Sequence, residues 1–341
     1  MSHPENAKPA IGTGPTPPTS EDLYAKVGLG ALPFGATAAD LYIDMVKRAV
    51  INILYEDNSV WYFDADNHHV MSGAFNLEHR LQGRDLPSEA HTMVGLQRLN
   101  HLQWCAETAI REGVPGDFVE TGVLRGGAAI FLRAILKAHS VTDRRVVACD
   151  TFMTRKPIPS GLGFRFALRV LALLATIRNR SWRRRLFFML QDKLGSQSSF
   201  PPVANPSDQM IDGTMFLIRN LPSIRYPRDR TSLAAVRSHF ARYGLLDEQV
   251  LFLQGFFSDT LPMAPIRQVA ILRLDGDTYE STRDVLESSY AKLSRGGFCI
   301  VDDYHAYPDC KRAVDEYRAS HGIVEAMQSI DQHAVYWRKP D

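Results

Sequence analysis

The chain has 341 residues, with 39 lysines and arginines against 38 aspartates and glutamates, so its formal net charge is +1. Hydrophobic residues make up 45% and charged residues 23%, a composition that excludes a disordered chain and is typical of a soluble globular protein. The balanced charge argues against nucleic acid as the main partner, because neutralising a phosphate backbone requires a large excess of basic side chains.

The N-terminal third of the chain is predicted to be mainly helical. Residues 1–38 predict a disordered leader, because prolines recur there among glycine, threonine and serine. Residues 39–113 are expected to form an N-terminal helical cap. Apolar residues at helical spacing predict helices in Ala39–Glu56 and Thr92–Gly113, and the polar and aromatic stretch Trp61–Gln82 between them predicts a loop.

Strand and helix patterns alternate through residues 114–341. The predicted strands are Asp117–Glu120, Arg145–Cys149, Val250–Gln254, Gln268–Leu274, Phe298–Val301 and Ala334–Trp337. The predicted helices are Ala128–His139, Leu233–Tyr243, Thr278–Leu293, which a turn at Arg295–Gly297 follows, and Cys310–His321. This alternation predicts an α/β fold, a Rossmann-like and mostly parallel sheet with helices on both faces. Ligands of such sheets bind outside the carboxyl ends of the strands.

Residues 161–229 interrupt the alternation and are expected to be an insertion, part amphipathic helix and part loop. Leu171–Leu194 combines apolar side chains with a run of arginines, and the segment that follows, to Asp229, is rich in proline, serine and asparagine. The arginines are most simply a solvated helix face, with a membrane surface or an anionic substrate as the alternative. Because long insertions often serve as lids, we predict that this one packs over the acceptor pocket, with Ser196–Ser207 mobile until substrate binds.

The four cysteines lie far apart in the chain and form neither a disulfide framework nor a zinc-binding pattern, so we expect reduced cysteines in the core. The most apolar segment, Phe166–Ile177, is interrupted by Arg169 and is too short to span a bilayer. We therefore expect a cytoplasmic protein without a transmembrane segment. We also expect a homo-oligomer, most simply a dimer.

The glycine-rich segment Glu120–Gly127 follows a predicted strand and opens a predicted helix. Its glycines allow a ligand to lie against the backbone at the helix N-terminus. The middle glycine of the dinucleotide fingerprint is missing, and a carboxylate at Glu120 would repel a pyrophosphate but suits an ammonium group, such as that of S-adenosylmethionine. Glu120, Thr121, Gly122 and Gly126 are therefore candidate donor-binding residues. The alternative is an ordinary turn between strand and helix.

Two further aspartates are candidates for the same ligand. Asp150 ends the second predicted strand of this domain and could accept hydrogen bonds from both ribose hydroxyls, since an ionised carboxylate is a bidentate acceptor. Asp259 lies after the next predicted strand and could face the same ligand. A turn or helix-capping role is the alternative for each.

An acidic group follows two apolar strands. Asp275 and Asp277 come after one strand, and Asp302 and Asp303 after the next, so their carboxylates should converge at one edge of the sheet. Three or four carboxylates share a small site only with a cation or protons to offset their repulsion, and ligation by oxygen alone suits Mg²⁺, Mn²⁺ or Ca²⁺. The alternative is solvated loop acids, with Asp277 capping the next helix. His305 is more simply a loop histidine at the pocket mouth than a base.

At these residues the chain resembles the macrocin O-methyltransferase family, which methylates sugar hydroxyls of antibiotics and related glycosylated natural products. The resemblance covers most of Ala39–Lys339 except the insertion. It is carried by Tyr42–Arg48, Ala90–Gly95, Gly113–Asp117, Glu120–Gly127, Phe240–Leu245, Leu272–Thr282 and Gly297–Tyr304. Leu124 departs from the family pattern, in which an aromatic residue is expected.

The resemblance implies a class I methyltransferase fold that uses S-adenosylmethionine and Mg²⁺. Asp275, Asp302 and Asp303 fall on the family's metal-ligand positions, and Asp275 also on its proposed base. Glu120, Gly122 and Asp150 fall on its methyl-donor site, and the partner is a small glycosylated acceptor.

The resulting prediction is an Mg²⁺-dependent O-methyltransferase acting on a sugar hydroxyl. A sugar hydroxyl is a poor nucleophile at neutral pH, so it needs a metal to lower its pKa and a base to take its proton. Two alternatives stay open. One is a metal-dependent methyltransferase of catechol-like phenols, and the other is a non-enzymatic binding protein that keeps the fold and uses the insertion as an interaction element.

Overall fold

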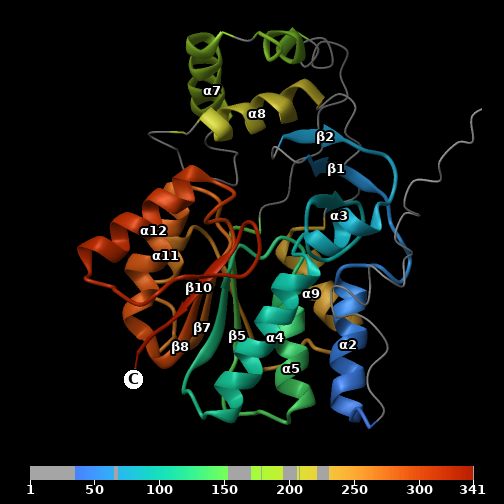
Figure 1. The fold of residues 1–341 in the computed structure, drawn as a ribbon, viewed down its shortest axis with the longest axis vertical. Coiled ribbons are helices and arrows are strands. Elements are labelled where there is room, and N and C mark those ends of the chain that lie inside the picture. The colour runs from blue at the N-terminus through green and yellow to red at the C-terminus, as the bar shows by residue number, and fades with distance from the viewer. Residues whose placement is uncertain are drawn as a thin grey trace, which may run out of the picture.

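The computed structural model describes residues 35–64, 68–152, 170–177, 179–194, 206, 208–220 and 230–340. At its centre lies a seven-stranded sheet with the strand order β6-β5-β4-β7-β8-β10-β9 (Figure 1). The strands are β4 (Asp117–Thr121), β5 (Val146–Asp150), β6 (Val250–Gln254), β7 (Val269–Leu274), β8 (Leu293–Val301), β9 (Gln328–Ser329) and β10 (Val335–Arg338). Strands β4 to β8 pair in parallel, whereas β10 is antiparallel to both β8 and β9. The predicted mostly parallel sheet is confirmed.

Side chains alternate between the two faces of this sheet, as the pleat requires. Phe118 of β4 belongs to one apolar core and its neighbour Val119 to the other. The first core is covered by α2 (Ala38–Val50), α4 (Leu96–Arg111), α5 (Gly127–Ala138) and α9 (Leu233–Arg242), and the second by α11 (Tyr279–Ser289) and α12 (Pro308–Ser320). Helices therefore cover both faces of the sheet, which explains why the sequences of the central strands are almost continuously apolar.

The segment Trp61–Gln82, predicted as a loop, instead contains regular structure. A second sheet with the order β2-β1-β3 is formed by β1 (Ser59–Phe63), β2 (His69–Met71) and β3 (Asp85–Pro87), with α3 (Leu77–Gln82) between the last two. The loop prediction was wrong partly because β2 and β3 have only three residues each and show little alternation. The Val-Trp-Tyr-Phe run of β1, which has high strand propensity, was the available signal.

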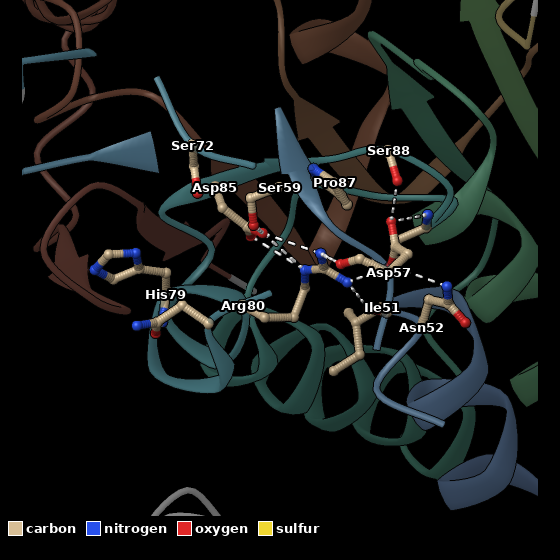
Figure 2. A network of polar contacts seen from close by, with 12 residues as sticks. Ile51, Asn52, Asp57, Ser59, Ser72, His79, Arg80, Asp85, Pro87 and Ser88 are labelled. Atoms are coloured by element: carbon tan, nitrogen blue, oxygen red, sulfur yellow. Dashed lines mark hydrogen bonds and ion pairs between the residues drawn. The ribbon is translucent and has the colours of Figure 1, made fainter. Parts of the chain in front are cut away.

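A buried arginine fixes this small sheet to the rest of the chain (Figure 2). Arg80 of α3 is only 2% exposed and donates hydrogen bonds to the backbone carbonyl of Ile51 and to the Asp57 carboxylate, at 2.9 and 2.7 Å. Its Nε lies 3.2 and 3.0 Å from the two carboxylate oxygens of Asp85. One side chain thus joins α3, β3 and the segment after α2, and its removal would leave two buried carboxylates uncompensated.

Two helices of the predicted insertion pack against each other at one end of the molecule, next to β2 (Figure 1). They are α7 (Arg180–Leu194) and α8 (Asp208–Asn220), and α8 lies in a segment predicted as loop. Their shared core includes Leu186, Leu190, Ile211 and Met215, and α7 arginines pair with α8 aspartates, as in Arg183–Asp212 at 2.7 Å. Part of the arginine run therefore joins the two helices. The predicted mobile stretch Ser196–Ser207 falls almost entirely outside the described residues, as does the leader up to residue 34.

The C-terminal half differs from the prediction at one junction. Helix α11 ends at Ser289, a single 3-10 turn (Tyr290–Lys292) follows, and β8 already begins at Leu293. The predicted turn at Arg295–Gly297 is thus part of the strand, because the Gly296 N–H and the Gly297 carbonyl both pair with Lys339. The glycines mark a local irregularity of β8 instead of its beginning.

Two global expectations can be compared with the structure. All four cysteines are free and buried, as predicted for core residues. Within the described part of the chain, no helix is both long enough and apolar enough to cross a membrane.

Candidate active site

A cavity of about 400 Å³ opens at the carboxyl ends of the parallel strands. Its walls come from the turn after β4, the end of β5, the loops after β6, β7 and β8, the small N-terminal sheet and the turn before β10. The turns after β4 and β7 meet where the strand order reverses, which is the place at which sheets of this kind bind ligands.

The glycine-rich turn after β4 is shaped by its contact with the acidic loop. Gly122 has a φ of +89°, and a Cβ there would lie 1.8 Å from the Asp275 carbonyl oxygen, so no larger residue fits. The Asp275 N–H donates to the Thr121 carbonyl at 2.9 Å, while the Thr121 hydroxyl donates to the Arg273 carbonyl at 3.1 Å. Gly126 faces Val236 of α9. Of these predicted donor residues, Gly122 lines the cavity and Thr121 and Gly126 support the turn.

Glu120 lies at the end of β4 and lines the cavity, with its side chain 2% exposed. Its Oε1 accepts a hydrogen bond from Arg273 at 2.8 Å, but its buried Oε2 has no partner among the described residues. Burial raises the pKa of Glu120 to about 8, and the charge of Arg273 only partly opposes this. A cationic group bound beside Oε2 would stabilise the carboxylate, so Glu120 fits the predicted ammonium contact.

The two aspartates predicted for the same ligand lie in different environments. Asp150 lines the cavity, but its Oδ2 accepts the N–H groups of Val123 and Leu124 at 2.7 and 3.3 Å, and its Oδ1 accepts that of Phe152 at 2.9 Å. Its carboxylate therefore orders the glycine-rich turn. Asp259 is exposed on α10 (Phe257–Thr260) and is not among the described residues that line the cavity. The structure gives no support for a donor contact at Asp259.

Three carboxylates converge at the ends of β7 and β8. Asp275, Asp277 and Asp303 each offer an oxygen, and these oxygens lie within 4.8 Å of one another. Burial, followed by the charge of the neighbouring acids, raises the pKa of Asp275 to about 6 and that of Asp277 to about 7. The same causes raise the pKa of Asp303 well above its ordinary value, and its Oδ2 is buried without a partner among the described residues. The group holds more negative charge than its surroundings compensate.

Asp302, also predicted as a member of this acidic group, has different contacts. Asp302 sends its carboxylate to two arginines: it accepts a hydrogen bond from Arg273 at 2.5 Å and another from Arg98 of α4. Although burial alone would raise the pKa of Asp302, the two arginines outweigh it and hold the pKa below its ordinary value. Asp277 joins the group instead, and it does not cap α11, since Thr278 does. Asp302 and Asp303 therefore have different partners although they are adjacent in the sequence.

A buried arginine that the sequence analysis missed connects the two halves of the site. Arg273 is 2% exposed and donates to Glu120 and Asp275, at 2.8 Å each, as well as to Asp302. The signal for it was present, because Arg273 is the one charged residue in the apolar strand Val269–Leu274. His305 is exposed and is not among the described lining residues, so the structure gives it no role in the cavity.

Comparisons with known proteins agree with this architecture. A family model described as macrocin-O-methyltransferase (TylF) matches residues 39–163 and 219–339 and leaves out the centre of the predicted insertion. The chain is 41% identical to the mycinamicin III 3''-O-methyltransferase of Micromonospora griseorubida over 89% of its own length and 98% of that protein. It is 40% identical to a tetracenomycin rhamnosyl 4'-O-methyltransferase of Streptomyces olivaceus over 88% of its own length and 93% of that protein.

A solved structure agrees with the sequence comparisons. The O-methyltransferase NovP superimposes with a TM-score of 0.64 at 37% identity, covering 89% of this chain and all of that one. The resemblance noted in the sequence and the predicted class I methyltransferase fold are thereby confirmed. The chain belongs to the macrocin-O-methyltransferase family and is an O-methyltransferase.

Proposed function

We propose that the chain transfers the methyl group of S-adenosylmethionine to a sugar hydroxyl of a glycosylated natural product of the antibiotic type, with Mg²⁺ at the acidic group. The observation that carries this proposal is the incompletely compensated trio Asp275, Asp277 and Asp303 in the same cavity as the unpaired oxygen of Glu120. The names of the relatives support the acceptor class, since mycinamicin III and a rhamnosyl tetracenomycin are their substrates.

The donor fits the half of the cavity over β4, β5 and β6. The free Oε2 of Glu120 is placed to accept a hydrogen bond from the ammonium group of the donor. The turn that Asp150 orders supplies backbone next to it, and a ribose contact by Asp150 stays a prediction because its oxygens already accept N–H groups. Gly255 and Phe256, after β6, line the far end of this half.

The acidic group fits a divalent cation. A donor set of oxygens alone and an unpartnered oxygen on Asp303 fit an Mg²⁺ site. The raised pKa values of Asp275 and Asp277 reflect burial and mutual repulsion, which a bound cation would offset. Asp275, Asp277 and Asp303 would hold the ion, while Asp302 positions the neighbouring arginines. When bound, Mg²⁺ supplies charge that lowers the pKa of a nearby sugar hydroxyl.

Asp275 is the base of the proposed reaction. Arg273 donates to one of its oxygens at 2.8 Å, so the other oxygen would both contact the ion and accept the proton of the acceptor hydroxyl. The hydroxyl oxygen then attacks the sulfonium methyl in line as the carbon–sulfur bond breaks. The walls of the cavity hold oxygen and methyl at about 3 Å, and this positioning supplies much of the rate.

The test is methyl transfer from labelled S-adenosylmethionine, followed by mass spectrometry, to a panel of deoxysugar glycosides and catechols. Transfer to a glycoside that stops in EDTA and returns with Mg²⁺, while donor binding persists in EDTA, is the expected result. Full activity in EDTA would contradict the proposed role of Mg²⁺ and leave Asp275 as a base that acts without a metal. Transfer to catechols alone would show that the acceptor is a catechol-like phenol and not a sugar. The non-enzymatic alternative is set aside by membership of the family.

A further inference from the structure

Two buried polar side chains that line the cavity lack hydrogen-bond partners among the described residues. His333, in the turn before β10, is 5% exposed, and both of its ring nitrogens are unpaired. Trp61 of β1 is 7% exposed, and its indole Nε1 is also unpaired. Buried donors and acceptors in native proteins are almost always satisfied by protein, water or ligand. These atoms therefore mark places where polar atoms of a bound molecule belong.

The strand order places His333 on the acceptor side of the cavity. Across the sheet, Glu120 lies near the end of β4, Asp275 follows β7, Asp303 lies in the turn after β8, and His333 precedes β10. The acidic group thus lies between the proposed donor half and His333. A molecule that presents a hydroxyl to the acidic group from the side away from the donor extends toward His333.

An aromatic wall stands next to His333. The rings of Trp61 and Phe63 are 5.0 Å apart, and that of His69 lies 4.7 and 4.6 Å from them. Phe63 in turn faces His333 at 6.4 Å. A sugar ring has apolar C–H faces that pack on aromatic rings and hydroxyls that satisfy unpaired nitrogens. A plain aromatic acceptor would pack on the wall but leave those nitrogens unpaired, which costs binding energy.

The backbone of His333 is connected to the acidic group through Asp331 and Arg98. Its backbone N–H donates to the Asp331 carboxylate at 2.8 Å, and Arg98 donates to the other oxygen of Asp331 at 2.8 Å. The same Arg98 holds Asp302, which precedes Asp303. Burial lowers the pKa of His333, so its imidazole is neutral at pH 7 and offers one N–H donor and one acceptor.

The insertion supports the aromatic wall from outside the cavity. Phe216 of α8 stacks on His69, with ring centroids 5.0 Å apart and planes inclined by 25°. Gly213, one turn earlier in α8, brings its backbone so close that a Cβ there would lie 3.3 Å from the His69 ring. This contact connects the insertion to the acceptor side, as the lid prediction requires.

The geometry points to a sugar-binding subsite formed by Trp61, Phe63, His69 and His333, in which the indole N–H and the imidazole bind hydroxyls next to the one that is methylated. His333 is therefore a residue that determines acceptor specificity. This inference rests on the proposed function, since it takes the methyl acceptor to be a sugar.

The experiment measures glycoside binding separately from methyl transfer. Holoenzyme saturated with Mg²⁺ and S-adenosylhomocysteine is titrated with methyl α-L-rhamnopyranoside, with saturation-transfer NMR as the readout. His333→Phe keeps the ring but removes both nitrogens, and Trp61→Phe removes the indole N–H. The matched control is His305→Phe, in which an exposed histidine is changed two residues after Asp303.

We expect Trp61→Phe to weaken glycoside binding about three- to tenfold, the effect of one lost neutral hydrogen bond. His333→Phe should weaken it at least as much, because it removes both a donor and an acceptor. The affinity for S-adenosylhomocysteine and the melting temperature should match the control. Unchanged glycoside binding in both variants overturns the subsite. So does a fall in melting temperature and donor affinity together, which would show a structural role. A wild-type enzyme that binds the glycoside but methylates none contradicts the proposed function alone, and one that binds no glycoside overturns both.

Discussion

Two buried networks of arginine and aspartate in this molecule differ in how completely they are satisfied. Around Arg80, the oxygens of Asp57 and Asp85 accept hydrogen bonds from the arginine, from Asn52 and Ser88 and from backbone N–H groups (Figure 2). At the cavity, Glu120 and Asp303 each keep a buried oxygen without a partner among the described residues, although Arg273 and Arg98 lie close by.

This difference indicates that the Arg80 network stabilises the fold and that the cavity network binds a ligand. A network whose acceptors are all used has nothing left to offer a ligand, and its energy goes into holding the fold. A network with buried, unpaired oxygens is incomplete without a cation. The composition of the two networks is alike, so only the hydrogen-bond accounting distinguishes them.

The largest effect is expected at the acidic group. Asp275→Asn removes the proposed base, so turnover should fall by about 10²- to 10⁴-fold, the usual contribution of a positioned acid or base. Donor affinity, measured by calorimetry, should stay at the wild-type value. Asp259→Asn is the control, because this exposed residue lies outside the cavity lining, and wild-type turnover is expected there. If Asp275→Asn lowered turnover only slightly, another residue would have to be the base.

The satisfied network should respond in stability instead. Arg80→Met leaves two buried carboxylates without their cation, so the free energy of unfolding should fall by about 3–5 kcal/mol in urea titrations. Arg111→Met, whose side chain is 66% exposed, should change it by less than about 0.5 kcal/mol. An Arg80→Met protein of wild-type stability would end the distinction drawn between the networks.

Two neighbouring residues sharpen the comparison within one turn. Asp302→Asn weakens two charge-assisted contacts with Arg273 and Arg98, so it should lower the free energy of unfolding by about 1.5–3 kcal/mol. Asp303→Asn removes surplus charge, and the metal-free protein should be as stable as the wild type or more so, while Mg²⁺ binding by calorimetry is lost. Equal losses of stability in both variants would place Asp303 in a structural network too.

The smallest effect concerns pH. Because the pKa values of Asp275 and Asp277 are raised from 3.8 to about 6 and about 7, the folded protein binds more protons than the unfolded chain in that interval. The stability of the metal-free protein should therefore fall as the pH rises from about 4 to about 7. The contribution should be about 1 kcal/mol, since the Asp275 side chain is 27% exposed and solvent screens it. Saturating Mg²⁺, or the substitution Asp277→Asn, should make the unfolding midpoint depend less on pH.

Local patterns were enough to predict the sheet and most of the cavity. Apolar runs that end in an acid located β4, β5 and β7, and parallel strands bring their carboxyl ends together whatever the intervening sequence. Patterns were insufficient where partners come from distant segments. The choice between Asp302 and Asp303 depends on Arg98, which lies more than 200 residues earlier. The subsite combines Trp61 of β1, a strand that was predicted as a loop, with His333, which lies more than 200 residues later, so no single local pattern marked it.

The contact between the glycine-rich turn and the acidic loop changes how variants of that turn must be interpreted. Because a Cβ at Gly122 would overlap the Asp275 carbonyl oxygen, a substitution at Gly122 would also displace the acidic loop. A methyl group added to the turn would push the proton acceptor out of register while leaving Glu120 in place. A Gly122→Ala enzyme would then resemble a mutant of the acid site, with donor affinity retained and chemistry slowed. Mutational scans that assign function by position in the sequence would attribute that defect to the wrong half of the cavity.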